Sequence, residues 1–85
     1  MVWEVRVPKR VREGISHFPS HDREHILAAL RDISRDPWHG DIARISDSEN
    51  LWRKRVGNYR IFYSLDTQRA VVEVKETRRR ASKTY

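Results

Sequence analysis

The chemistry that this chain can carry out depends on arginine, which is concentrated in its last 35 residues. Residues 51–85 hold ten Lys and Arg against three Asp and Glu, a balance of +7, whereas residues 1–50 hold eight against nine. Fourteen of the 18 basic residues are Arg, whose planar guanidinium group forms paired hydrogen bonds with phosphate oxygens. This asymmetry is typical of a protein that contacts nucleic acid or an acidic protein partner, although a solvated basic tail is the alternative.

The residue types of the basic half also limit how it can move protons. All four His residues lie between positions 17 and 39, and the only carboxylates after position 50 are Asp66, Glu73 and Glu76. An acid–base site made of paired histidines or paired carboxylates is therefore not expected there. Arginine and tyrosine remain, and they favour phosphoryl transfer through charge stabilisation, with a tyrosine hydroxyl as the group that transfers the proton.

One pattern in the first half resembles a metal site. Residues 21–25 read His-Asp-Arg-Glu-His, which matches the H-x-x-E-H pattern of one class of zinc proteases. A catalytic zinc needs a third protein ligand and a cleft, for which an 85-residue chain has little room. The chain has no Cys and hence no thiolate ligand. We therefore expect ordinary polar residues in the first turn of a helix, with no metal and no other cofactor.

The elements that position these residues follow from the spacing of apolar side chains. Alternation with a period of two predicts strands, and stripes at i, i+3, i+4 and i+7 predict helices. Pro8 fits the first helical position and Ser20 is a good N-cap, while Gly57-Asn58 and residues 66–68 provide tight turns. The expected elements are strands at 2–7, 51–56, 59–65 and 69–75, helices at 8–18 and 20–36, and a possible short strand at 42–45.

This order predicts a single α+β domain that spans residues 1–85. A two-helix hairpin would pack on one face of a twisted, mainly antiparallel sheet. The N-terminal strand would be inserted into the sheet, which would end in a three-stranded meander, and the other face of the sheet would stay open. The second helix is expected to bury Ile26, Leu27, Leu30 and Ile33.

The alternation along the meander places arginines on the open face. On its first strand, Arg53 and Arg55 share one phase. On the next strand Tyr59 begins an apolar phase, which leaves Arg60 and Phe62 on the opposite side. If the Tyr59 phase forms the core, Arg60 joins the other two arginines. Guanidinium groups that share a face repel one another unless an anion lies among them, although their stems could instead cover apolar surface at a solvated edge.

The sequence from Trp52 to Tyr63 resembles the W-R-x-R-V-G-x-Y-R-x-x-Y core of the RelE/ParE toxin superfamily. The similarity extends along nearly the whole chain, from the opening strand through the helix hairpin to the closing strand. It implies a RelE-like microbial RNase-type fold and the role of a toxin in a type II toxin–antitoxin system. RelE-like toxins enter the ribosomal A site and cleave mRNA without metal. The mRNA 2′-hydroxyl attacks the adjacent phosphate, which gives a 2′,3′-cyclic phosphate end and a 5′-hydroxyl end.

The resemblance also implies roles for individual residues. Tyr85 would act as general base for the 2′-hydroxyl, Arg60 would hold the scissile phosphate, and Arg79 would stabilise the leaving 5′-oxygen. Phe62 could stack on a base, but core packing is its expected use. The residues expected to bind RNA are Arg53, Arg55, Arg78 and Arg80.

Two other functions stay open at this point. ParE-like members of the superfamily inhibit DNA gyrase and generally lack the cleavage residues, and a plain RNA-binding module would bind RNA in a salt-sensitive way without arresting growth.

The toxin hypothesis implies two partners, mRNA in the ribosomal A site and a cognate acidic antitoxin. The antitoxin would pair carboxylates with the arginines of the open face or displace residues 78–85, and Trp38 beside the helix hairpin would give it a further apolar contact.

The alternating charges of the first ten residues do not fit a secretory signal, and there is no apolar run of ~18 residues. We therefore expect a cytoplasmic protein without a membrane segment.

Overall fold

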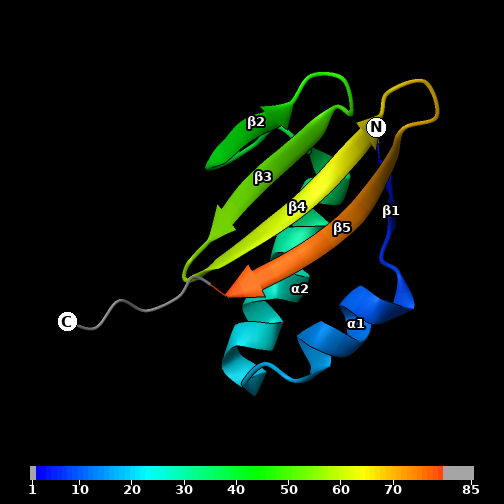
Figure 1. Cartoon of the computed structure of the whole chain (residues 1–85). Coiled ribbons are helices and arrows are strands. Elements are labelled where there is room, and N and C mark those ends of the chain that lie inside the picture. The colour runs from blue at the N-terminus through cyan, green and yellow to red at the C-terminus, as the bar shows by residue number, and fades with distance from the viewer. Residues whose placement is uncertain (1, 80–85) are drawn as a thin grey trace.

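The computed structural model describes residues 2–79, which form a five-stranded sheet with two helices on one of its faces (Figure 1). The strand order is β1-β5-β4-β3-β2, in which β1 is parallel to β5 and the other neighbours are antiparallel. The predicted α+β class, the helix hairpin on one face and the closing meander are thereby confirmed. The elements are β1 (Glu4–Arg6), α1 (Lys9–Ser16), α2 (Ser20–Arg35), β2 (Ile42–Ser46), β3 (Leu51–Val56), β4 (Tyr59–Asp66) and β5 (Val71–Arg79).

Each helix buries one apolar stripe against the sheet. Val11 and Ile15 are buried in α1. Leu27 of α2 was expected in the core but is 44% exposed, because successive helical residues are ~100° apart and this side chain lies beside the stripe. Neither helix of the described residues is long and apolar enough to cross a bilayer. The buried residues of α2 are Ile26, Ala29, Leu30 and Ile33.

Both helices begin directly after a proline. Pro8 is the N-cap of α1 and Pro19 is the N-cap of α2, with φ near −60° and ψ near 150°. Ser20 is consequently the first helical residue and makes no side-chain cap. The expectations of Pro8 inside the helix and Ser20 as the cap are therefore wrong by one residue, because the proline ring favours the extended backbone that precedes a first turn.

Two predictions about the strands are also wrong. β1 lies at the edge of the sheet and pairs only with β5, so it is not inserted between other strands. β5 continues to Arg79, because a bulge opposite Phe62 and Tyr63 shifts the register and pairing with β4 then resumes. The bulge is held by Arg10 of α1, whose Nη2 donates to the Lys75 carbonyl at 2.9 Å. As a result, the last arginines of the described chain belong to the sheet.

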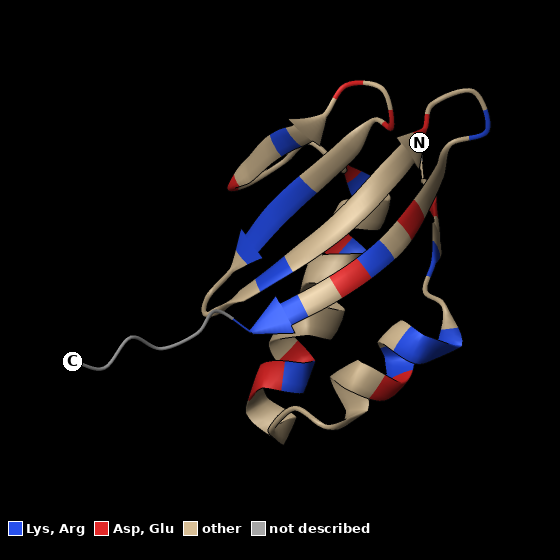
Figure 2. Ribbon diagram, viewed as in Figure 1, with Lys and Arg blue, Asp and Glu red and all other residues tan. Residues whose placement is uncertain are grey.

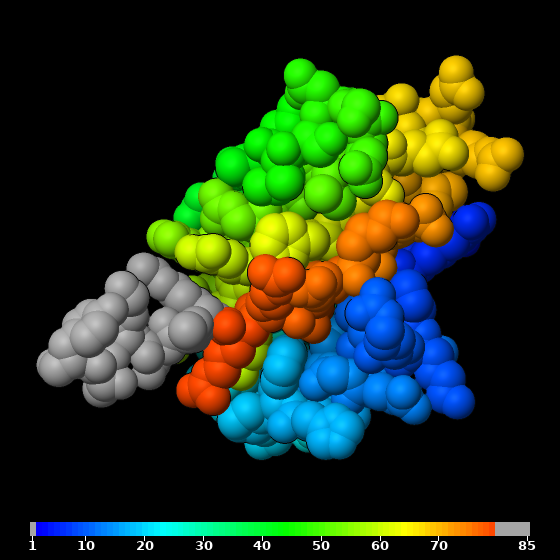
Figure 3. Space-filling view, in the orientation of Figure 1, coloured from blue at the N-terminus to red at the C-terminus, as the bar shows by residue number. Residues whose placement is uncertain are grey.

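The core lies between the sheet and the helices and is supplied largely by β4. Tyr63 is fully buried and donates its hydroxyl to the Pro37 carbonyl at 2.7 Å. Burial, and to a smaller degree the Asp36 carboxylate, raises the pKa of Tyr63 to about 12. The predicted core phase is confirmed, and Figure 3 shows that neither helix of residues 2–79 covers the opposite face of the sheet. The buried residues of β4 are Tyr59, Ile61, Tyr63 and Leu65.

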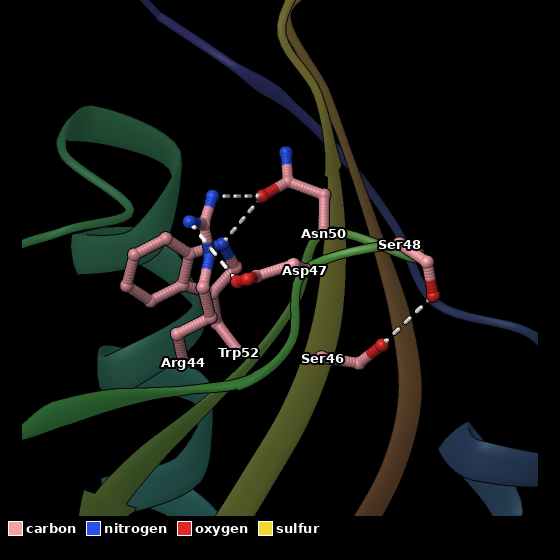
Figure 4. A network of polar contacts seen from close by, with 6 residues as sticks. All are labelled: Arg44, Ser46, Asp47, Ser48, Asn50 and Trp52. Atoms are coloured by element: carbon pink, nitrogen blue, oxygen red, sulfur yellow. Dashed lines mark hydrogen bonds and ion pairs between the residues drawn. The ribbon is translucent and has the colours of Figure 1, made fainter.

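Asn50, in the hairpin that joins β2 to β3, lies at the centre of a network of polar contacts with Arg44 and Trp52 (Figure 4). Its Nδ2 donates to the Leu65 carbonyl at 2.9 Å, and its Oδ1 accepts from Trp52 Nε1 at 2.9 Å. Arg44 donates to the same oxygen at 3.2 Å and lies 5.0 Å from the Trp52 ring centroid. Asn50 has φ of +48°, a conformation that Asn tolerates better than most residues. This network holds β3 in register with β4.

Candidate nucleic-acid interface

Three arginines lie side by side across the open face of the sheet. In the strand register, Arg55 of β3 is opposite Arg60 of β4, which is opposite Arg78 of β5. Figure 2 shows the basic segments of these three strands at the same end of the sheet. Because neighbouring strands are ~4.8 Å apart, the three side chains form one row, which we call the arginine row. The predicted placement of Arg60 and Arg55 on one face is confirmed.

The central member of the arginine row has the least compensated charge. Arg55 Nε lies 3.9 Å from Asp41 Oδ2, and Arg78 Nε pairs with Glu76 Oε2. Among residues 2–79, Arg60 makes no ion pair, and its buried Nε has no hydrogen-bond partner. A buried donor without a partner costs about 1–3 kcal/mol. An anion placed over the Arg60 guanidinium would reduce the repulsion along the row.

Lys54 fixes the outward direction of its two arginine neighbours. It is 6% exposed and lies on the helix side of β3, where its Nζ donates to the His39 carbonyl at 3.1 Å. Because successive strand residues face opposite sides, this burial turns Arg53 and Arg55 outward. The positioning role of Lys54 was not predicted, although a Lys between two outward-facing residues of a strand was the available signal.

The structure does not bring Arg79 together with Arg60. Arg79 is opposite Tyr59 in the register and therefore lies on the helix-side phase of β5. The Tyr59 hydroxyl donates to Asp22 Oδ2 at 2.8 Å. Burial and this hydrogen bond raise the pKa of Tyr59, and the positive charge of Arg79 partly opposes them. Arg78, which we expected only to bind RNA, instead takes the place beside Arg60, while Arg80 and Tyr85 lie outside the described residues.

A second rank of side chains lies next to the arginine row. Arg53, Phe62 and Glu76 are opposite one another on β3, β4 and β5. Phe62 is half-buried on the open face, so the expectation that it packs in the core is wrong. The Arg78 guanidinium lies 5.5 Å from the Phe62 ring centroid. A groove of about 440 Å³ opens here and is lined by Ile45, Glu49, Leu51, Phe62, Lys75, Glu76 and Arg78.

The described tyrosines and histidines lie away from this face. Tyr59 and Tyr63 are buried toward the helices. The His21 and His25 rings, from the zinc-protease-like pattern, pack on each other in α2 with centroids 4.4 Å apart. Within residues 2–79, no three His, Asp or Glu side chains are grouped so that they could hold a metal ion. The open face therefore provides positive charge, one aromatic ring and one carboxylate in its second rank.

Comparisons with known proteins place this fold in a family. The family model described as the ParE toxin of the type II toxin–antitoxin system parDE matches residues 8–83. No curated protein matches the sequence. A chain of the archaeal RelE–RelB complex from Pyrococcus horikoshii OT3 is similar, with 21% identity, a TM-score of 0.84, and coverage of 95% of this chain and 98% of that one.

Two further solved structures have the same fold. A chain of the RelBE2 toxin–antitoxin complex from Mycobacterium tuberculosis shows 21% identity and a TM-score of 0.80, with coverage of 94% of this chain and 100% of that one. The isolated E. coli RelE toxin shows 15% identity and a TM-score of 0.78, with coverage of 95% of this chain and 87% of that one. At these identities the likeness concerns the fold.

Proposed function

The chain belongs to the RelE/ParE superfamily of toxins from type II toxin–antitoxin systems, and from this premise we propose that it is a metal-independent endoribonuclease that cuts mRNA in the ribosomal A site. The observation that supports this activity best is the row of three arginines, whose central member, Arg60, makes no ion pair among residues 2–79. Such a row can stabilise the extra negative charge that develops on a phosphate during attack. The solved RelE toxins share this sheet and helix arrangement.

In the proposed reaction the 2′-oxygen forms a bond to phosphorus and the bond from phosphorus to the 5′-oxygen breaks. Arg60 holds the scissile phosphate, and Arg53 and Arg55 hold flanking phosphates. Tyr85 takes the 2′-hydroxyl proton, a role that rests on the family resemblance. The leaving 5′-oxygen is stabilised by an arginine and protonated by solvent, because Arg itself holds its proton too tightly to give it up readily.

The register favours Arg78 over Arg79 for the second arginine at the phosphate. Arg78 is directly opposite Arg60, whereas Arg79 is opposite Tyr59 on the other phase. In this proposal Arg78 contacts the scissile phosphate. Arg79 then contributes only long-range positive charge.

Reconstituted translation tests the proposed activity. Ribosomes with a defined codon in the A site are mixed with the purified protein in EDTA, and cut ends are mapped. We expect cleavage within the A-site codon, and Arg60→Ala should cut about 10²–10³-fold more slowly, as for loss of one charge-stabilising donor. Arg69→Ala is the matched control, because Arg69 is an exposed arginine beside Asp66 at the β4–β5 turn. Equal rates for the two variants would show that the arginine row is not the site.

We propose that an acidic antitoxin binds this toxin in the cytoplasm. Several of the similar structures are RelB–RelE complexes. Carboxylates of such a partner would neutralise the arginine row, and Trp38, which is 44% exposed and packs edge-on against Trp3, offers an apolar contact. Two results would support this pairing. A small acidic protein should co-purify with the chain even in ~0.5 M salt, where exposed charge pairs are screened, and its co-expression should restore growth.

Inhibition of DNA gyrase is the second candidate, because the family model that matches is that of the ParE toxin. It predicts loss of supercoiling activity in a gyrase assay with intact mRNA in the ribosome assay. Salt-sensitive RNA binding without growth arrest would instead indicate a plain RNA-binding module.

A further inference from the structure

The groove beside the arginine row has a composition that phosphate binding does not require. Its walls include the apolar side chains of Ile45, Leu51 and Phe62, and its polar side includes Glu76 and Arg78. Its volume is about 440 Å³, which is within the range of small-ligand sites. Phosphate binding needs only cations and N–H donors, so the aromatic ring and the carboxylate point to a different part of the substrate.

Phe62 lies at a suitable distance from the arginine row for one nucleotide. It is two residues from Arg60 on the same face of β4, which corresponds to ~6.8 Å along a strand. A phosphate on Arg60 and Arg78 would therefore place the attached nucleoside over Phe62. Single-stranded RNA is commonly recognised by stacking of its bases on aromatic rings and guanidinium planes, and Arg78 already lies 5.5 Å from the ring centroid.

The carboxylate of Glu76 would contact the edge of the base. An ionised carboxylate only accepts hydrogen bonds, and its Oε2 is paired with Arg78, whereas its Oε1 makes no hydrogen bond or ion pair among residues 2–79. Guanine presents two adjacent donors, N1–H and N2–H, on its Watson–Crick edge. Adenine and cytosine present an amino donor next to an acceptor, and uracil presents one N–H between two carbonyls. Glu76 therefore matches guanine best.

We propose that the groove is a nucleobase subsite that selects guanine next to the phosphate bound by the arginine row, an inference that rests on the proposed ribonuclease function. Phe62 stacks on the base, Glu76 accepts from N1–H and N2–H, and Ile45 and Leu51 exclude water from the base edge. An acidic peptide is a poorer occupant, because Glu49 and Glu76 balance Lys75 and Arg78 and leave the groove without net charge.

Nucleotide binding to the full chain tests the subsite without the ribosome. We expect 5′-GMP to bind more tightly than 5′-AMP, 5′-CMP or 5′-UMP in NMR titrations and to shift the Phe62 ring signals. Phe62→Leu should weaken GMP binding at least about fivefold. Glu76→Gln should remove the preference for GMP over AMP, whereas Glu4→Gln is a matched control because Glu4 is an exposed carboxylate of β1 that pairs with Arg6, and neither residue lines the groove.

Mapping of mRNA cuts separates this inference from the proposed function. Cleavage that prefers a guanine in one position of the codon, with the preference lost in Glu76→Gln, supports the subsite. Cleavage with the same base preference in wild type, Phe62→Leu and Glu76→Gln overturns the subsite and leaves the nuclease function intact. GMP binding with the expected variant effects but no cleavage supports the subsite and overturns the nuclease. Phe62 signals that respond to an acidic peptide but not to nucleotides overturn the subsite.

Discussion

Replacement of Arg60 by Met should make the protein more stable while abolishing its proposed activity. Arg60 lies between Arg55 and Arg78 in the register, and its buried Nε has no partner among residues 2–79. Met keeps the length of the stem and its packing but removes the charge and the unpaired donor. Functional sites commonly hold such unfavourable groups because the ligand relieves them.

The size of the gain can be worked out from these contacts. A like-charged pair directly opposite in a sheet costs about 0.2–1 kcal/mol, and Arg60 makes two such pairs. The unpaired buried donor adds about 1–3 kcal/mol. Because the neighbouring Arg55 and Arg78 are exposed, solvent screens much of the repulsion. We expect a net gain of about 1–2 kcal/mol, which corresponds to a rise in Tm of roughly 5–15 °C for a domain of this size.

Thermal and urea unfolding at two salt concentrations measure this gain. The gain in stability should be larger at ~0.01 M salt than at ~1 M salt, because the Debye length falls from about 30 Å to about 3 Å between these concentrations. Arg69→Met is the control, because it removes an arginine that is already near Asp66, and it should leave the stability nearly unchanged. If Arg60→Met is less stable than wild type, or if its gain does not depend on salt, the arginine row is not electrostatically strained and the reasoning is refuted.

Three further predictions concern the scaffold. Tyr63→Phe should lower the free energy of unfolding by about 1–3 kcal/mol in urea titrations, because it leaves the buried Pro37 carbonyl without its donor. Burial raises the pKa of Tyr63 to about 12, above the ~10 of an unfolded tyrosine. Its contribution is therefore complete below pH 10 and is lost as the pH rises toward 12, and a pH series of unfolding in Tyr63→Phe should show a smaller alkaline loss than wild type. Asn50→Ala should cost about 2 kcal/mol, because it removes the bond to the Leu65 carbonyl and places Ala at positive φ. Asn50→Gly should cost less, and equal losses in the two variants would show that the backbone conformation is not responsible.

Local patterns in the sequence were sufficient to determine the two faces of the sheet. The alternation from Tyr59 to Leu65 has a period of two, and all four residues of its apolar phase are buried, so the position of Arg60 on the open face followed directly. The helical stripe through Ile26 and Ile33 was equally informative, because helical periodicity is a property of neighbouring residues. The concentration of Arg after residue 50 identified the basic half that supplies the arginine row.

Only the tertiary structure decided which arginines meet. The end of β5 and the bulge opposite Phe62 depend on pairing with β4 and on the bond from Arg10 to the Lys75 carbonyl, and no local pattern near position 78 encodes either. A shift of one residue exchanges the two faces of a strand, and it is this register that places Arg78 beside Arg60. The burial of Lys54 likewise depends on the distant His39 carbonyl. Segment composition and periodicity are local properties, whereas strand register arises from contacts between distant segments, and it decides how the arginines are arranged.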